Sequence, residues 1–328
     1  MSDDRPSLLF HLSAGCHMNY YEKSDKELWQ ESVDKANDDR LTAVRMLAHR
    51  LDHKGKYKES MALLETTLSS IDHKVDTHDW LDITFLVGNT KTGLHQYDQA
   101  LVLHSSCLPI ARESMDLEMI SYHARNSALC KSRLNVYDKE WLSYLDEACS
   151  AADDSGDIHL QSHIHNTARY QYYYGREFEK SLNSAKIVYD YWDDRYDTDM
   201  QAFAALALGS AYIYALDVEN AEKYLSEAIS LATISGNEGV LQSVSVCMGK
   251  LALLQGDIMR ARKNFKNAGS CERMGRDMEE TAVEAVYWWA VITRDNLNAK
   301  KGQKHLDLIM PAIKKFDLED RLVPLPGM

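Results

Sequence analysis

A short pattern recurs along this 328-residue chain at intervals of 40 residues, and this period constrains the fold more than any other feature. In each copy an aromatic or β-branched residue is followed, three positions later, by a small residue, which is typical of the turn between two antiparallel helices. The small residues lie 40, 81, 40 and 40 positions apart, and they are Ser60, Ala100, Ser181, Ala221 and Ala261. The chain is therefore predicted to be an array of helical hairpins.

The doubled interval predicts a further hairpin that the pattern hides, with its turn near residue 141. Trp141 stands where the other copies have a small residue, so we expect this junction to be distorted. The same period predicts one more turn at residues 295–298, between two stretches of helical pattern. Together these turns predict about seven hairpins.

The apolar residues within each unit follow helical spacing, which favours two amphipathic helices per unit. A second set of small residues lies twelve positions before the small residue of each turn, and it comprises Ala48, Gly88, Gly209 and Gly249. A large side chain at these positions would push the two helices apart. We therefore expect the helices of a hairpin to approach closely there.

Two stretches carry a likeness to a known family. One is Leu86-Val87-Gly88-Asn89 followed by Gly93, Tyr97, Ala100 and His104, and the other is Leu208-Gly209 followed by Tyr212, Ala221, Leu225 and Ala228. The chain resembles the tetratricopeptide repeat (TPR) family over residues 40–316, in the long-helix form of rapsyn and kinesin light chains. The resemblance implies an all-α fold, an α-α superhelix of about seven helical hairpins.

The chain divides into three predicted segments. Residues 1–26 carry no clear repeat and form an N-terminal extension, either capping the first hairpin or disordered. Residues 27–316 form the TPR-like domain. Residues 317–328 form an extended tail that docks elsewhere or stays free, because Pro324 and Pro326 cannot continue a helix.

Charge and cysteine usage narrow the class of partner and the compartment. The formal charge is −13 without a basic stripe, which disfavours nucleic acid and anionic membranes as partners. The longest apolar run, residues 202–216, is too short to span a bilayer, so no membrane insertion is expected. Six irregularly spaced cysteines, without a Cys-x-x-Cys pair, are typical of reduced thiols. These features predict a cytoplasmic protein.

The sequence contains none of the common motifs of catalysis or cofactor binding, which predicts a protein that is not an enzyme and holds no cofactor. The best metal candidates are His159 and His163, one helical turn apart, but no third or fourth ligand accompanies them. We therefore expect solvated or hydrogen-bonded histidines rather than a metal site.

The resemblance also implies that the first helix of each hairpin lines the concave groove. By this register the candidate partner-binding residues are Arg45, His49, Asp52, Phe85, Asn89, Thr92, Asn166, Tyr170, Tyr173, Leu206, Ser210, Ile213, Val246, Lys250 and Leu253. Phe85 stands where a clamp for a terminal carboxylate would need a basic residue, so such a clamp is not expected.

Two of these assignments leave alternatives open. Tyr170 and Tyr173 either pack in the fold or contact a partner, because tyrosine is common both in cores and among interface hot spots. Asn89 either holds the backbone of an extended ligand, as the resemblance implies, or makes a local hydrogen bond.

Three functions compete on these grounds. The first is a non-enzymatic scaffold or adaptor, part of a larger complex, that binds a peptide or helical segment of another protein in its groove. The second is a peptide-responsive switch of the TPR sensor type, although no basic helix-turn-helix precedes residue 40. The third is a non-catalytic subunit that positions an enzyme.

Overall fold

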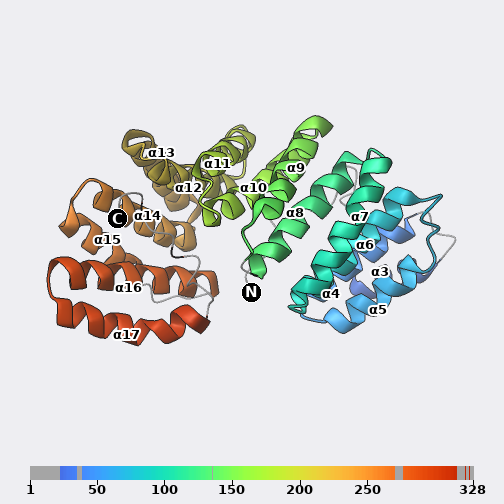
Figure 1. Ribbon diagram of the computed structural model, residues 1–328, viewed down its shortest axis with the longest axis horizontal. Helices are drawn as coiled ribbons and strands as arrows, with labels where there is room; N and C mark the ends of the chain where they lie inside the picture. Colours follow the sequence, from blue (N-terminus) through green and yellow to red (C-terminus); the bar gives the residue numbers. More distant parts are fainter. Residues whose placement is uncertain are drawn as a thin grey trace. The chain divides into compact units, whose positions relative to one another are not determined.

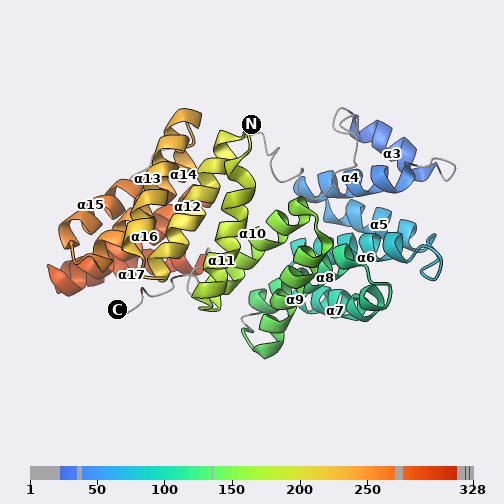
Figure 2. The same ribbon diagram turned by 90° about the horizontal axis from the view of Figure 1, so that it is seen from above.

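The computed structural model describes residues 23–34, 39–134, 136–269 and 276–315, together with Leu322 and Leu325, and of residues 276–280 it describes the backbone alone. Within these ranges every regular element is a helix, and the fifteen helices confirm the all-α prediction (Figures 1 and 2). The chain forms two compact units, residues 1–171 and residues 172–328. Each unit is described by itself.

The helices form seven consecutive hairpins preceded by one additional helix. The first unit contains α3 (Asp25–Val33), α4 (Arg40–His53), α5 (Tyr57–Leu68), α6 (Thr77–Gly93), α7 (Tyr97–Glu113), α8 (Leu117–Arg133), α9 (Lys139–Ser155) and most of α10 (Ile158–Tyr174). The second contains α11 (Phe178–Asp193), α12 (Thr198–Tyr214), α13 (Val218–Ser235), α14 (Glu238–Leu254), α15 (Ile258–Gly269), α16 (Arg276–Asn296) and α17 (Ala299–Lys315). The predicted number of hairpins is confirmed.

The recurring turn is a Schellman closure of the first helix. After α4, Lys56 N donates to Leu51 O at 2.8 Å and Gly55 N donates to Asp52 O at 2.9 Å, with Gly55 in the left-handed region at φ 70°. The equivalent left-handed residues in the later turns are His95, Arg176, Leu216 and Gly256. The same backbone geometry therefore recurs with different side chains, which explains why the sequence pattern is clearest in the residues that flank the turn.

The junction between α8 and α9 differs from the others, as the sequence predicts. Five residues, 134–138, connect these helices, whereas three connect α4 to α5. Asp138 caps α9 by accepting from Trp141 N at 2.8 Å, and the Trp141 side chain is buried. The indole occupies the place of the usual small residue, which accounts for the longer connection.

Close approach within the hairpins is confirmed at the helical glycines. A Cβ added at Gly209 would lie 2.8 Å from Leu225 Cγ and 3.0 Å from its backbone N, and one at Gly249 would lie 2.6 Å from Phe265 Cε1. These distances are shorter than van der Waals contact. In these two hairpins the helices are therefore in contact at a point where only glycine fits.

The first helices of consecutive hairpins also pack on one another. Within the first unit α4 contacts α6 and α6 contacts α8, and within the second α12 contacts α14 and α14 contacts α16. Among the described helices no comparable contact joins α5 to α7 or α13 to α15. We call the more closely packed side of each unit its first-helix face.

Side chains of neighbouring hairpins pair at a regular offset of 37 or 38 residues. The pairs include Arg45 with Asp82, Asp52 with Thr90, His78 with Asp116, Arg125 with His163, Tyr189 with Glu227 and Glu222 with Arg260. This offset is about two residues shorter than the repeat. The side of a helix that faces the preceding hairpin lies half a turn away from the side that faces the next hairpin, and two residues rotate by about 200° around the helix axis, which is close to half a turn. Each hairpin therefore contacts the preceding and the following hairpin through opposite sides of the same helix.

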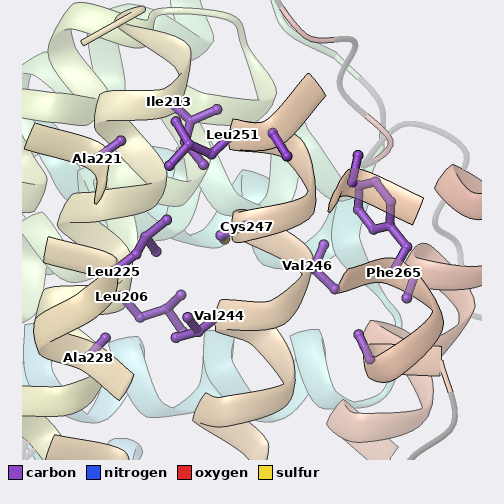
Figure 3. Close-up of a cluster of buried hydrophobic side chains, with 14 of the residues drawn as sticks. Leu206, Ile213, Ala221, Leu225, Ala228, Val244, Val246, Cys247, Leu251 and Phe265 are labelled. Carbon is purple, nitrogen blue, oxygen red and sulfur yellow. The ribbon is translucent and has the colours of Figure 1, made fainter. Parts of the chain in front are cut away.

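Each unit has its own apolar core. In the first, the core of α3 to α6 includes Leu28, Leu47, Leu64 and Ile83, all nearly inaccessible to solvent. In the second, Leu206, Ile213, Leu225, Val246 and Phe265 belong to one large cluster (Figure 3).

Candidate functional site

A group of polar and aromatic side chains meets on the first-helix face of the first unit, and we call it the Arg125 cluster. Its members come from three successive first helices and are Phe85 and Asn89 of α6, Tyr122, Arg125 and Asn126 of α8, and His163 of α10. Phe85 and Asn89 stand four positions apart, and Arg125 and Asn126 stand three and four positions after Tyr122, so helical spacing brings them to one side.

Arg125 is the only charged member of this cluster. Its Nε donates to Asn126 Oδ1 at 3.0 Å and its Nη1 donates to His163 Nε2. The guanidinium carbon lies 5.7 Å from the centre of the Phe85 ring and 5.4 Å from that of Tyr122, within the range of cation–π contacts. All four neighbours are neutral.

The guanidinium is buried without a carboxylate partner in the described part of the chain. Arg125 is only 5% exposed, and none of its ion pairs or hydrogen bonds there involves an acidic group. Burial lowers the pKa of Arg125 to about 10, so the side chain remains protonated at neutral pH. A buried cation with only neutral neighbours is costly, and an incoming anion would relieve that cost.

Asn126 links Arg125 to a buried pair of histidines. Its Nδ2 donates to Asn89 Oδ1 at 2.5 Å and to His104 Nε2 at 3.4 Å, while its Oδ1 accepts from Arg125. The interaction with Arg125 fixes the orientation of the amide, because a guanidinium can only donate. Asn89 therefore accepts a hydrogen bond from the neighbouring hairpin, and its binding of an extended ligand stays a prediction.

The network also fixes the histidine tautomers. His123 Nε2 lies 3.2 Å from the carbonyl oxygen of Leu81 and must carry a proton, so its Nδ1 accepts from His104 Nδ1 at 3.1 Å. His104 Nε2 is then the acceptor for Asn126. Burial lowers the pKa of His123 to about 4 and that of His104 well below its ordinary value, consistent with both rings being neutral.

The candidate residues of the first hairpin have partners inside the fold. Arg45 forms ion pairs with Asp79, at 3.2 Å, and with Asp82. Asp52 Oδ2 accepts from Thr90 at 2.8 Å, and burial raises the pKa of Asp52. His49, half-buried, has its pKa lowered to about 4 by burial. These side chains join the first hairpin to the second.

The remaining candidates of the first unit are Thr92, Asn166 and Tyr170. Thr92 donates to Gly88 O at 3.0 Å, and Asn166 accepts from Arg169 Nε at 3.0 Å. Tyr170 is exposed, and the guanidinium carbon of Arg169 lies 3.8 Å from the centre of its ring. An exposed aromatic ring with a cation on one face is available for contact with another molecule.

In the second unit most candidate residues are covered. Leu206, Ile213, Val246 and Leu253 are at most 9% exposed and share one cluster, whereas Ser210 is half-buried (Figure 3). These four apolar side chains are part of the core in this structure. A partner can reach these side chains only where whatever covers them moves away.

Lys250 is the charged residue among the candidates of the second unit. It is buried beside a counterion that the sequence pattern did not predict. Its Nζ lies 2.6 Å from Glu284 Oε1, and the rings of Tyr214 and Trp288 lie 5.7 Å and 6.0 Å away. Burial alone would lower the pKa of Lys250, but Glu284 raises it well above the ordinary value. Tyr173 donates to Tyr214 Oη at 2.7 Å and is largely covered.

The described residues form no cluster of potential metal ligands. His163 Nε2 is occupied by Arg125, His159 is exposed, and no group of three potential ligands comes together in the described ranges. A small cleft in the second unit is lined by Tyr189, Asp193 and Glu227. No helix in the part of the chain that is described has the length and hydrophobicity to cross a membrane.

Sequence reasoning did not find the residues at the centre of the Arg125 cluster. The first helix of the hairpin formed by α8 and α9 contains Tyr122, Arg125 and Asn126. The turn of this hairpin matches the repeat pattern least well, so the pattern could not align this helix with the first helices of the other hairpins. The offset between hairpins supplies the missing signal, because Tyr122 and Asn126 each lie 37 positions after a predicted residue, Phe85 and Asn89.

Comparison with proteins of known structure supports the fold. BtubC (BKLC) from P. vanneervenii has a TM-score of 0.55 at 16% identity, covering 65% of this chain and 89% of the other. A Rap protein complexed with competence and sporulation factor has a TM-score of 0.58 at 13% identity, covering 90% of this chain and 78% of the other. A signal transduction ATPase with a tetratricopeptide repeat sensor from Pyrococcus horikoshii has a TM-score of 0.54 at 14% identity, covering 89% of this chain and 46% of the other.

These likenesses place the chain in one structural class. It is an α-solenoid of tetratricopeptide-like helical hairpins, as its sequence predicts. No family's sequence profile matches the chain, and no curated protein is similar to it in sequence.

Proposed function

We propose that the protein is a non-enzymatic adaptor that binds a segment of another protein on the first-helix face of its first unit. The observation that supports this proposal best is the buried, uncompensated charge of Arg125. A buried charge that adds no net stability to the free protein is a good candidate for a functional residue, because it gains a counterion only when a partner binds.

The chemistry of the cluster defines the segment that would fit. Phe85, Tyr122 and Arg125 are 3%, 7% and 5% exposed, so a bound segment must first displace the side chains that cover them. Arg125 would then offer guanidinium donors to a carboxylate, and Phe85 and Tyr122 would offer an apolar wall beside it. The overall charge of −13 would repel an acidic stretch. The best ligand is therefore a segment with a single Asp or Glu among apolar or basic residues, and the exposed Tyr170 extends the same face.

A peptide-display selection would test this proposal. Immobilised protein should enrich peptides with one acidic residue, and the Arg125→Gln variant should lose that enrichment, with binding of the selected peptides weakened about 30-fold or more. Arg112→Gln is the matched control, because Arg112 pairs with Glu147 at 2.7 Å on the outer helices α7 and α9. Selection of the same peptides by the Arg125→Gln variant would contradict the proposal.

A peptide-responsive switch is the second candidate. Two of the similar structures favour it, one a Rap protein complexed with competence and sporulation factor and the other a protein with a tetratricopeptide repeat sensor. X-ray scattering with and without a selected peptide distinguishes the two functions, since a switch changes its scattering profile and a passive adaptor does not.

We also propose that the protein works in the cytoplasm as part of a larger complex. Three cysteines in the described ranges, Cys107, Cys130 and Cys247, are free and buried. Burial raises the pKa of Cys107 to about 12 and that of Cys130 to about 11, so neither thiol is reactive at neutral pH. Free thiols suit a reducing compartment.

A further inference from the structure

Two leucines near the C-terminus pack against the second unit. Leu325 is 1% exposed and belongs to the same buried cluster as residues of α12, α14 and α16. Leu322 is half-buried and packs against a second cluster that includes Val283 of α16 and Ile313 of α17. Neither leucine is part of a helix. The two side chains, three positions apart, therefore contact two neighbouring apolar sites.

The cluster that holds Leu325 also contains the residues that the repeat register assigned to partner binding. Leu206, Ile213, Val246 and Leu253 all belong to it. These four side chains are nearly inaccessible, as Leu325 is. The repeat pattern predicts that this apolar surface is free to bind a partner, but in the structure it is part of a packed core.

The sequence around Leu325 suits a segment that docks in an extended conformation. Pro324 and Pro326 stand on either side of it. Prolines restrict the free segment, so less conformational entropy is lost on docking. Since α17 ends at Lys315 and the leucine pair follows within ten residues, the segment is also held close to its site.

We propose that the C-terminal segment, residues 317–328, is an intramolecular ligand of the second unit, with Leu322 and Leu325 as its two anchors. An external peptide with two leucines three positions apart would bind the same apolar sites, and would have to displace the chain's own segment first. The tether gives the resident segment an effective concentration of about 1 mM, so it competes against any weak external ligand. This inference goes beyond the proposed function, because it concerns the second unit and does not involve Arg125.

The test uses the full chain and a synthetic, fluorescently labelled peptide of residues 317–328. In the Leu322→Ser/Leu325→Ser variant the site is vacated, so the peptide should bind at least about tenfold more tightly than to the unchanged protein, as measured by anisotropy. Leu308→Ser is the matched control, because Leu308 of α17 is exposed, and it should bind the peptide as weakly as the unchanged protein does. A peptide with both leucines replaced by serine should bind none of them.

Equal binding of the peptide to the double variant and to the unchanged protein would overturn the proposal, and so would binding to neither. If the double variant melts at a lower temperature, added peptide should raise its Tm, and an unchanged Tm would also overturn the proposal. The Arg125→Gln variant should show the same peptide binding as the unchanged protein, which separates this result from the test of the proposed function.

Discussion

Replacing Arg125 with methionine should leave the free energy of unfolding almost unchanged, which is unusual for a charged residue that is 5% exposed. Burial lowers the pKa of Arg125 from 12.5 to about 10, a shift that corresponds to a cost of about 3 kcal/mol for holding the charge in the folded state. Methionine removes that cost and fills much of the same volume.

The substitution also removes favourable contacts. The hydrogen bonds to Asn126 and His163 contribute about 1 kcal/mol each, and the cation–π contacts with Phe85 and Tyr122 together contribute about 1 kcal/mol. Gains and losses therefore cancel to within about 1 kcal/mol. A buried charge that is paired with a counterion would instead cost about 3 to 5 kcal/mol to break.

Urea unfolding followed by far-UV circular dichroism measures this difference. Arg112→Met serves as the control at an exposed ion pair, and its loss should stay below about 1 kcal/mol. If Arg125→Met destabilises the protein by about 3 kcal/mol or more, the guanidinium is a structural group with a counterion, and the reasoning behind the proposed function fails.

Three further predictions concern stability. The unfolded chain takes up protons below the ordinary histidine pKa of 6.5, whereas folded His123 does so only near its pKa of about 4. The folded state should therefore lose about 2 kcal/mol of stability through His123 between pH 7 and pH 5, measured by urea unfolding. His104, whose pKa burial also lowers, should add to this loss. Gly209→Ala should lower the free energy of unfolding by about 1 to 2 kcal/mol, although alanine is the better helix former, because the added methyl overlaps the facing helix. Glu284→Gln should cost about 3 to 5 kcal/mol in thermal or urea unfolding, because it leaves Lys250 buried without a counterion.

Each of these predictions has a control of the same chemical kind. His95→Gln, at an exposed histidine, should not change the pH dependence, which a His123→Gln variant should reduce. Gly269→Ala should be tolerated, since the nearest side-chain atom is a Val286 methyl at 3.1 Å. Glu222→Gln breaks only an exposed pair and should cost less than about 1 kcal/mol. The argument from helix contact would be contradicted if Gly209→Ala stabilised the protein. The argument from buried histidines would be contradicted if the pH dependence did not change in the His123→Gln variant. The argument from the buried ion pair would be contradicted if Glu284→Gln left the free energy of unfolding unchanged.

The helical array could be predicted from the sequence because its determinants are local and periodic. The small residues at the turns and at the helix contacts recur every 40 residues, and Gly209 shows why: the neighbouring helix leaves no room for a methyl group. The distorted junction at Trp141 could be predicted for the same reason, as a local departure from a local rule.

The interactions that define the candidate sites depend on pairs of residues from different hairpins, which local patterns do not reveal. Nothing near Lys250 in the sequence points to Glu284, and nothing near Arg125 indicates that it lacks an acidic partner. The docking of Leu325 against helices about 40 to 120 positions earlier is more distant still. The repeat thus predicts which side chains share a helix face, but only the structure shows which residues they contact.

The half-turn offset between paired side chains limits how such a chain can change in length. One residue inserted in the middle of a helix would rotate every later position of that helix by about 100°, and would misalign its contacts with both neighbouring hairpins at once. Inserting a whole unit of about 40 residues would keep each side of every helix in phase. The connection between α5 and α6, residues 69–76, lies outside this constraint, so added residues should be tolerated there first.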